Sequence, residues 1–472
     1  MAGKPGFNGL SPSEWTVLSR SIFDSKDVSS PREDFHKEHG ATFSVALAER
    51  AIKMYSAVDD IVFDPFLGTG TTVVAARQNN RNSVGIELYD RFAEIAEGRV
   101  KQKTLGEQKE TKIYRGNCLE QIKQVEDLTI QLTFTSPPYA DFIHRSVKDR
   151  ERRAKGSMPS LIATENKSSV NAYGDSDSDF GNQEYSLFLK SVTELMKEIY
   201  RVTKPGGYNV WVVKDHRDTQ NLQPYIDVHS DMAICGQDAN FLYHDLIIMD
   251  QNEQRRLVLL GYPSVFYTNQ NHSYLVVLRK PTVDQAKKLM KIYKKEQTEE
   301  YGKMKLTQLR KILRNKKLNL SGNKPDLIAR IVNQDCLERW GYIGIVDNAE
   351  RLVKKFRKEQ DEIYKEMSVD ELQEIRRMRD LKDSKKKKDL IKIIVNQDCL
   401  EQWEHAGLKN ITFDQAEKIL QIFRKGQVGI YNSMNVTELR EILRNKKLKL
   451  SGNKPDLVAR IVNQDCLDLE VV

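Results

Sequence analysis

The sequence predicts an α/β domain with a mainly parallel sheet, followed by an all-α region of helix–extended–helix repeats. Three observations lead to this fold class. Short apolar runs alternate with helical patterns over residues 1–281. A Gly-Thr-Gly turn joins the first apolar run to a helix. After Pro281 the chain repeats itself three times, at a spacing of 63 and then 67 residues. A chain of 472 residues is long enough for two or more domains.

The sheet is expected from six short apolar segments. Helices are expected around 14–22, over 43–55, from Thr71, and over 89–100, because apolar residues recur there at helical spacing. Strands that alternate with helices favour a parallel sheet, in which a crossover helix joins consecutive strands. The expected strands are 61–63, 83–88, 112–118, 130–138, 206–214 and 272–280.

The segment from Asp64 to Thr72, DPFLGTGTT, lies where a strand ends, the chain turns tightly and a helix begins. Gly68 and Gly70 permit positive φ and allow a ligand to touch the backbone. Glu87 ends the next expected strand, where a carboxylate can accept hydrogen bonds from ribose hydroxyls. A turn in an unrelated α/β domain is the alternative, but the combination of features predicts a cofactor site.

This motif resembles the cofactor motif of the amino-group DNA methyltransferases, and the resemblance covers about residues 35–281. It implies a class I, Rossmann-like methyltransferase domain with S-adenosylmethionine as cofactor. Glu87 would hold the ribose, and Asn117 would lie beside the adenine, where the family usually has Asp. Phe43 belongs to a segment that would close over the methionine end, although Gly40 stands where Pro is usual. The resemblance places at the pocket Asp64, Phe66, Gly68, Gly70, Thr71 and Thr72.

A second motif, Ser136-Pro137-Pro138-Tyr139, ends the strand expected over 130–138. Two consecutive prolines fix φ and remove two backbone donors, but their carbonyls remain as acceptors. The exocyclic amine of a base is a poor nucleophile, because its lone pair is delocalised into the ring. Acceptors against its two hydrogens, here the Ser136 hydroxyl and the Pro137 carbonyl, would localise that lone pair. Tyr139 would stack on a base that has left the duplex.

The resemblance also indicates the base. Ser-Pro-Pro-Tyr is the form common among cytosine-N4 methyltransferases, whereas Asp-Pro-Pro-Tyr is commoner among adenine-N6 enzymes. We therefore expect site-specific methylation of cytosine N4 in duplex DNA, with a cognate restriction endonuclease as partner if the enzyme protects self DNA. Methylation at cytosine C5 is not expected, since none of the five cysteines follows Pro. Adenine N6, RNA and a catalytically inactive DNA-binding scaffold remain as alternatives.

Residues 141–183 interrupt the alternation of strands and helices. They are polar, rich in Ser, Asp, Lys and Arg, and show no apolar period. So long a loop inside a compact domain is either functional or disordered. We expect it to lie over the catalytic mouth and to bind or read target DNA, and residues around 215–265 are the rival segment for that role.

The repeats are expected over 284–340, 347–403 and 414–468. In the first copy, apolar residues from Leu306 to Leu313 mark one helix face, an extended link follows, and Pro325 fits the first turn of a second helix. This pattern resembles the SAP module, a small DNA-binding unit, and implies double-stranded DNA as partner. The middle copy departs from the pattern, because lysines replace the Gly and Pro of the other copies.

Positive charge gathers in these repeats. Residues 284–472 carry 41 Lys+Arg and 30 Asp+Glu, whereas residues 1–283 carry 34 and 37. The excess suggests a polyanion as partner. Contacts from lysines to phosphates would be salt-sensitive and largely independent of base sequence. A helical array that binds protein, or nothing, is the alternative. The lysines expected at the DNA are Lys316, Lys317, Lys324, Lys385, Lys387, Lys388, Lys446, Lys447 and Lys454.

Composition argues against several other classes. The sequence has no CxxC pair, so no metal site is expected and a disulfide framework is unsupported. It has no uncharged apolar stretch of about 18 residues, so no membrane span is expected. The first residues lack the apolar run of a signal peptide. We therefore expect a soluble intracellular protein.

Overall fold

A computed structural model of the chain divides into two compact units, Met1–Thr282 and Val283–Val472. The structure describes residues 6–29, 43–102, 109–138, 174, 176–218, 223–253, 266–384, 386–403 and 411–468. Within these ranges no helix is both long enough and apolar enough to span a bilayer.

The first unit contains an eight-stranded sheet in the order β1-β9-β10-β6-β5-β2-β3-β4. From β4 to β6 the neighbouring strands are parallel, whereas β10 is antiparallel to both β6 and β9. The strand order reverses between β2 and β5, where open α/β sheets bind their ligands. The bounds are β1 (Ile22–Asp24), β2 (Ile61–Asp64), β3 (Asn82–Glu87), β4 (Thr111–Arg115), β5 (Ile130–Thr135), β6 (Thr203–Val213), β9 (Leu242–Asp250) and β10 (His272–Arg279).

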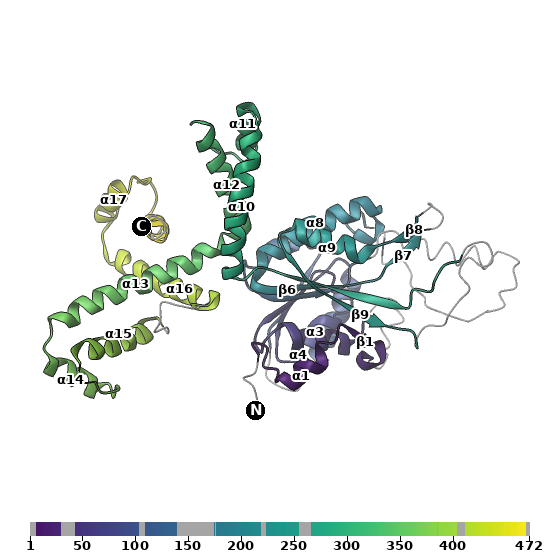
Figure 1. The fold of residues 1–472 in the computed structure, drawn as a ribbon, viewed down its shortest axis with the longest axis horizontal. Coiled ribbons are helices and arrows are strands. Elements are labelled where there is room, and N and C mark those ends of the chain that lie inside the picture. The colour runs from purple at the N-terminus through teal and green to yellow at the C-terminus, as the bar shows by residue number, and fades with distance from the viewer. Residues whose placement is uncertain are drawn as a thin grey trace, which may run out of the picture. The chain divides into compact units, whose positions relative to one another are not determined.

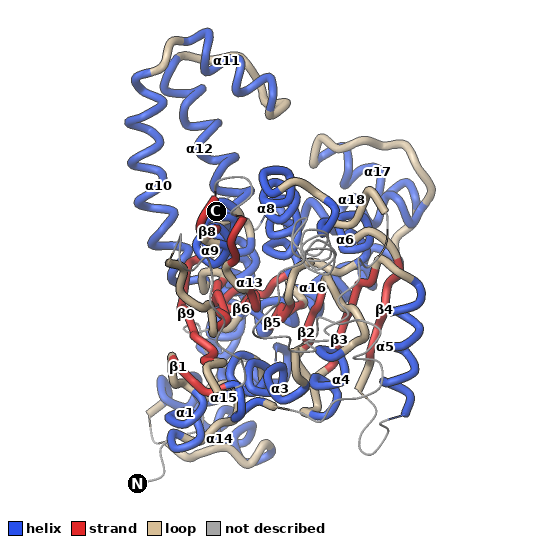
Figure 2. The backbone as a smooth tube through the Cα atoms, turned by 90° about the vertical axis from the view of Figure 1, so that its right-hand side faces the viewer, coloured by secondary structure: helices blue, strands red, loops and turns tan. Residues whose placement is uncertain are grey.

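Helices cover both faces of this sheet, with α3 and α4 on one side and α8 and α9 on the other (Figure 1). Figure 2 shows the strands from β9 to β4 in a row between these two layers. The helices are α1 (Pro12–Leu18), α3 (Val45–Tyr55), α4 (Thr71–Gln78), α5 (Asp90–Gln102), α6 (Cys118–Gln121), α8 (Tyr185–Val202) and α9 (Val228–Asp238), with short 3₁₀ turns η1 (Ser25–Val28), η2 (Ile122–Gln124) and η3 (Phe180–Asn182).

Helix α3 shows why the core forms where it does. The Ser44 hydroxyl accepts a hydrogen bond from the Leu47 N–H and caps the helix. Leu47 and Ile52 are fully buried on one face of α3, against Phe134 of β5 and Val210 of β6. The main hydrophobic core therefore lies between α3 and the central strands, and it fixes the position of the strand ends.

The predicted fold class is confirmed, and several details differ, such as the strand expected over 112–118, which ends at Arg115. Strand β5 ends at Thr135, three residues earlier than expected, because Pro137 and Pro138 cannot donate hydrogen bonds to a ladder. The sequence did not indicate β1 or β9. It also did not indicate a small separate hairpin of β7 (His216–Asp218) and β8 (Gln223–Ile226).

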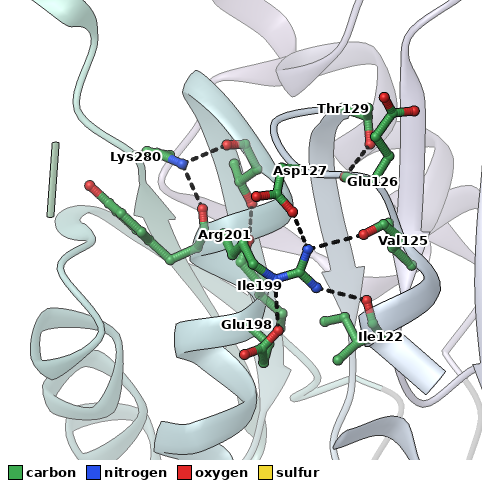
Figure 3. A network of polar contacts seen from close by, with 11 residues as sticks. Ile122, Val125, Glu126, Asp127, Thr129, Glu198, Ile199, Arg201 and Lys280 are labelled. Carbon is green, nitrogen blue, oxygen red and sulfur yellow. Dashed lines mark hydrogen bonds and ion pairs between the residues drawn. The ribbon is translucent and has the colours of Figure 1, made fainter. Parts of the chain in front are cut away.

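A polar network lies where α8 ends, near the residues at which the central strands β5 and β6 begin (Figure 3). This end of the strands is opposite the end at which the candidate site lies. The Arg201 guanidinium donates to the carbonyls of Ile122 at 2.9 Å and Val125 at 3.1 Å, and it pairs with Asp127. Lys280, only 2% exposed, donates to the carbonyls of Tyr200 at 2.6 Å and Thr203 at 2.8 Å. These bonds anchor the last strand of the unit to the C-terminus of α8.

The second unit consists of three copies of one motif, a long helix followed by a short helix, an extended link and a second helix (Figure 1). Buried leucines hold each pair of shorter helices together, such as Leu439 and Leu457 in the third copy. The helices are α10 (Val283–Lys303), α11 (Leu306–Asn315) and α12 (Lys324–Trp340), then α13 (Tyr342–Glu366), α14 (Val369–Met378) and α15 (Lys387–Trp403), then α16 (Phe413–Ser433), α17 (Val436–Asn445) and α18 (Lys454–Asp468).

One repeat position near the start of each long helix holds a buried alanine. Ala286, Ala349 and Ala416 are all fully buried, each near the N-terminus of its long helix. Lys287 of α10 pairs with Asp347 of α13 at 2.7 Å, and α13 packs against α16. A small side chain allows close helix approach, which explains the same residue type at this position in all three copies.

Candidate active site

The candidate site is built around the turn between β2 and α4. Gly68 and Gly70 have φ of 54° and 85°, in the left-handed region. A Cβ on Gly70 would lie 2.7 Å from the Cβ of Ala96 in α5, so no side chain fits there. The turn can therefore form only with glycine at this position, and it places backbone groups at the carboxyl end of the sheet.

The buried Asp64 side chain stabilises this turn through hydrogen bonds. Its carboxylate is 1% exposed and accepts hydrogen bonds from the Phe66 N–H at 3.0 Å and from the hydroxyls of Thr72 and Thr135, both at 2.6 Å. Burial raises the Asp64 pKa to about 6, while these three bonds act in the opposite direction. Asp64 thus joins the turn after β2 to the end of β5.

A pocket of about 880 Å³, partly open to solvent, lies above the turn at the strand ends. Of the residues that the sequence placed at the cofactor, Asp64, Gly70 and Thr72 are outside its lining and support the turn instead. The predicted residues that line the pocket are Phe43, Phe66, Gly68, Thr71, Glu87, Asn117, Ser136, Pro137 and Pro138.

Glu87 is the central acidic group of the pocket. It ends β3, is 6% exposed, and accepts hydrogen bonds from the N–H groups of Gly68 at 2.7 Å and Tyr89 at 2.9 Å. Each of its oxygens retains a second lone pair that a ligand hydroxyl can use. Burial raises the Glu87 pKa to about 7. Nearby, the Asn117 side chain accepts from the Leu119 N–H at 2.9 Å and caps α6.

The Ser-Pro-Pro segment reaches the same pocket from β5. Thr135 is paired in register with Trp211 of β6, and Ser136 to Pro138 continue beyond the last ladder pair. Trp211 is fully buried and packs edge-on against Phe66, at 6.1 Å between ring centroids. The structure therefore brings the two sequence motifs to one cavity. Tyr139 lies outside the described residues.

The end of the polar insert supplies three pocket residues that the sequence analysis did not single out. Ser178, Asp179 and Phe180 line the cavity. The Tyr89 hydroxyl donates to Asp179 at 2.8 Å, and Phe180 packs edge-on against Phe66 at 5.4 Å. Residues 139–173 and 175 of this region lie outside the described residues. The insert 141–183 was expected over the catalytic mouth, but no signal marked these three residues within it, because their partners are distant in the chain.

The lining has a distinct chemical character. Among the lining residues that the structure describes, two are carboxylates, Glu87 and Asp179, and none is basic. Five aromatic rings surround them, which attract a cation through their electron-rich faces. The pocket is thus suited to a cationic ligand with an apolar body. The rings belong to Phe43, Phe66, Tyr89, Phe92 and Phe180.

Three further side chains could offer ligands to a metal. Among the described residues, Asp215, Asp227 and His229 bring ligand atoms within 4.8 Å of one another. The His229 Nδ1 lies 2.9 Å from an Asp215 oxygen and 2.8 Å from an Asp227 oxygen. Hydrogen bonds therefore hold this group together.

Five of the lysines expected at the DNA bond within their own repeat. Lys316 pairs with Asp335 at 2.8 Å, and Lys446 pairs with Asp465 at 2.9 Å. The lysine that begins the second short helix donates to a carbonyl at the end of the long helix in every copy, with distances of 2.6, 2.8 and 2.7 Å for Lys324, Lys387 and Lys454.

The remaining predicted lysines face solvent where they are described. Lys317, Lys388 and Lys447 are exposed, and Lys317 and Lys447 share a φ of 56° just after the first short helix of their copies. Lys385 lies outside the described residues. The exposed set offers its charge to a partner, whereas the bonded set holds the repeats together.

Comparisons with known families match both units. A family described as DNA methylase matches residues 12–98, and the SAP domain family matches residues 300–336 and 430–466. The SAP matches fall on the first and third copies of the repeat. The two matches support a chain that joins a DNA methylase region to SAP domains.

Several curated relatives are similar over part of the chain. The Type II methyltransferase M.MthZI of Methanothermobacter thermautotrophicus is 46% identical over 66 residues, which is 14% of this chain and 19% of the relative. The Type II methyltransferase M.BglI of Bacillus subtilis is 33% identical over 129 residues, covering 26% of this chain and 36% of the relative. The chain thus spans between a fifth and about a third of these relatives.

Solved structures are similar at lower identity. A SAM-dependent methyltransferase from Methanosarcina mazei is 13% identical with a TM-score of 0.29, covering 49% of this chain and 97% of that one. A geranyl diphosphate C-methyltransferase from Streptomyces coelicolor A3(2) is 12% identical with a TM-score of 0.30, covering 54% of this chain and 86% of that one.

Proposed function

We propose that this protein is an S-adenosylmethionine-dependent DNA methyltransferase that methylates the exocyclic N4 amine of cytosine. One observation carries the proposal. Ser136, Pro137 and Pro138 line the same pocket as the glycine turn and Glu87. A methyl donor bound on the turn and an acceptor amine at the Ser-Pro-Pro segment would therefore meet in one cavity, and proximity supplies much of the catalytic effect.

The pocket residues fit the cofactor. S-adenosylmethionine carries a positive sulfonium, and the lining offers two carboxylates and five aromatic rings. Glu87 has lone pairs left for the ribose hydroxyls. The Thr69 hydroxyl is 1% exposed, lies in the lining and has no hydrogen-bond partner among the described residues, so it can serve a polar group of the ligand. When bound, the cofactor supplies the methyl group.

The residues of the second motif orient the acceptor. The Ser136 hydroxyl and the Pro137 carbonyl accept hydrogen bonds from the two amine hydrogens and localise the nitrogen lone pair toward the methyl donor. The nitrogen would gain the methyl group and lose one hydrogen as a proton, which the Ser136 hydroxyl would relay to solvent water. Tyr139 stacks on the base once it has left the duplex. Serine in the first position favours cytosine N4 over adenine N6.

The repeats hold the enzyme on duplex DNA. Exposed lysines such as Lys317 and Lys447 contact phosphates, and three linked weak modules raise the effective concentration of DNA at the active site. Removing residues 283–472 is expected to raise the KM for DNA more than it lowers kcat. Relatives such as M.BglI are named Type II methyltransferases, which supports a role beside a restriction endonuclease.

Mass spectrometry of nucleosides tests the proposal. The protein is incubated with isotope-labelled S-adenosylmethionine and unmethylated duplex DNA, which is then digested. Label in N4-methylcytosine that Ser136→Ala loses, and that the exposed-site control Ser19→Ala keeps, is the expected result. Label in N6-methyladenine would keep the mechanism and correct the base. No label, with cofactor still bound, would refute catalysis on DNA.

A further inference from the structure

The short segment that ends the polar insert contacts both motifs of the candidate site, and Asp179 lies at its centre. The Asp179 carboxylate is 5% exposed, and both of its oxygens accept hydrogen bonds. One oxygen accepts from the Tyr89 hydroxyl at 2.8 Å, and the other accepts from the Gly181 N–H at 2.8 Å. Asp179 therefore joins the chain after β3 to the turn η3.

Tyr89 carries the contact to Glu87. Its N–H donates to the Glu87 carboxylate at 2.9 Å, and its ring lines the pocket. Burial and the hydrogen bond to Asp179 raise the pKa of the Tyr89 hydroxyl, so this hydroxyl stays protonated and acts as the donor. A Cβ on Gly174 would overlap the Tyr89 ring, so the chain packs closely against that ring. Asp179 therefore fixes the orientation of a pocket wall beside Glu87.

Gly181 carries the contact to the Ser-Pro-Pro segment. A Cβ on Gly181 would lie 3.3 Å from the Pro138 Cβ, so the Gly181 backbone packs against that proline. The preceding Phe180 is buried and packs edge-on against Phe66. Phe66 in turn packs against Trp211, which is paired with the last residue of β5. The segment therefore contacts the glycine-turn motif and the Ser-Pro-Pro motif at once.

The energetics of burial explain why Asp179 can hold both contacts in place. A buried carboxylate is costly unless hydrogen bonds replace its hydration. The loss of either donor would leave part of that cost uncompensated, so the Tyr89 hydroxyl and the Gly181 N–H are both held at the Asp179 oxygens. Asp179 thus keeps a fixed geometry between the pocket wall at Tyr89 and the backbone that packs on Pro138.

We propose that Asp179 is a positioning residue for methyl transfer, which fixes Tyr89 at the cofactor and the Gly181 backbone against Pro138. The proposal rests on the proposed function. Methyl transfer requires the donor and the acceptor amine to be aligned, and a small misplacement of either lowers the rate strongly. Asp179 acts through the geometry of its two hydrogen bonds, and not through the attraction of its charge for the cofactor.

Two measurements on the full-length protein separate the two contacts. Calorimetry without DNA gives the Kd for S-adenosylmethionine, and turnover with saturating cofactor and unmethylated plasmid DNA gives kcat. Asp179→Ala should raise this Kd about tenfold, because the Tyr89 wall is released, and should lower kcat about tenfold to a hundredfold, because Gly181 is released as well. Tyr89→Phe keeps the ring and the bond to Gly181, so it should raise the Kd by a similar factor but lower kcat less.

Asp179→Asn separates geometry from charge. The amide oxygen of Asn can still accept from the Gly181 N–H, and its NH₂ group can donate to the Tyr89 oxygen. This variant should therefore stay within about threefold of the parent in Kd and kcat. If Asp179 acted by attracting the cationic cofactor, Asn would lose as much affinity as Ala, and that result would refute the positioning role.

A double variant shows whether Asp179 acts through Tyr89. In a Tyr89→Phe background the bond to Asp179 is already absent, so Asp179→Ala should raise the Kd for S-adenosylmethionine no further. It should still lower kcat in that background, because the Gly181 N–H loses its acceptor. An increase in Kd as large as in the parent would mean that Asp179 contacts the cofactor directly, and would overturn the proposal.

Tyr185→Phe is the matched control. The Tyr185 hydroxyl donates to Asp231 at 2.7 Å, and neither residue lines the pocket. Removal of this hydroxyl should leave both the Kd and kcat unchanged, and an equal rise in Kd would contradict a role specific to Asp179. If Asp179→Ala does not fold, an unchanged Kd for Tyr89→Phe still refutes the proposal. A parent that binds no S-adenosylmethionine or does not methylate DNA would refute the proposed function itself, whereas an active parent with unaffected variants refutes only the positioning role.

Discussion

Replacement of Gly70 by Ala is expected to destabilise the first unit strongly. Gly70 has a φ of 85°, and a Cβ there would lie 2.7 Å from the Ala96 Cβ and 3.0 Å from its Cα. Left-handed φ costs a residue with a side chain about 1–2 kcal/mol. Forcing an additional methyl group into a packed core costs about 1–3 kcal/mol. The sum, about 2–5 kcal/mol, is a large part of the stability of an ordinary domain.

Gly98→Ala is the matched control for this prediction. Gly98 lies in the same region, inside α5, and a Cβ there would meet no atom within 4 Å. Its replacement by Ala should stabilise the unit by about 0.5–1 kcal/mol, because Ala loses less conformational entropy in a helix. A loss of stability for Gly70→Ala and a gain for Gly98→Ala would show that the local geometry decides how an added methyl group changes the stability of the unit.

Urea unfolding followed by tryptophan fluorescence measures both effects. In a background of Trp340→Phe and Trp403→Phe, the remaining Trp15 and Trp211 lie in the first unit and report on that unit. The unfolding midpoint should fall for Gly70→Ala and rise for Gly98→Ala. A Gly70→Ala variant that unfolds at the midpoint of the parent would refute the reasoning about the turn.

Three further predictions use other parts of the structure. Burial raises the Glu87 pKa to about 7, so protonation of Glu87 below that pH should weaken binding of a cationic cofactor; the Kd measured by calorimetry should rise as pH falls, and Glu87→Gln should remove the dependence. Lys316→Ala should lower the unfolding midpoint of the second unit, because it leaves Asp335 without its ion pair. Lys317→Ala should leave that midpoint unchanged and reduce the salt dependence of DNA binding by about one phosphate contact. Burial lowers the Lys280 pKa to about 7 from an ordinary value near 10.5, so the unfolded chain binds more protons between these values, and stability should rise with pH across that window. Lys280→Met should flatten this rise in urea titrations of the first unit, and a parent whose stability falls over the window would contradict the assignment.

The cofactor turn was predictable because its signals are local. Gly68, Gly70 and the strand before them specify a tight turn within nine residues, and Glu87 follows at the end of the next strand. Backbone conformation and strand ends are set mostly by neighbouring residues, so pattern analysis recovers them. The Ser-Pro-Pro segment was located by a local signal too, an apolar run that ends in two prolines, although the strand was expected to continue to residue 138 and ends at Thr135.

The insert residues at the pocket were not predictable in this way. Tyr89 and Asp179 are 90 positions apart, and their hydrogen bond depends on how the chain returns to the sheet after the insert. The insert was expected to lie over the catalytic mouth, but its polar composition does not indicate which side chains Asp179 and its neighbours contact there. Long-range pairing of polar side chains has no period in the sequence, so only a structure reveals it.

The sequence also could not predict which lysines of the repeats form ion pairs within their own repeat. Lys316 and Lys317 are adjacent and equal in charge, but Lys316 pairs with Asp335 whereas Lys317 is exposed at a φ of 56°. Asp335 is 7% exposed and also accepts hydrogen bonds from Tyr293 and Tyr301, both at 3.2 Å. A count of positive charge cannot separate a lysine that neutralises a buried carboxylate from one that faces a partner.

The distribution of charge explains why two units share the task. Residues 1–283 carry more acidic than basic side chains, and two of the acidic side chains line the pocket. The net negative charge of this unit attracts a cationic cofactor but repels the phosphates of DNA. The basic excess lies entirely in residues 284–472, so under the proposed function long-range attraction of DNA would come from the repeats. The first unit would then need only short-range contacts to DNA, which do not depend on net charge. The proposed cofactor and the proposed DNA substrate require opposite local charge, and the chain carries the two signs of charge on separate units.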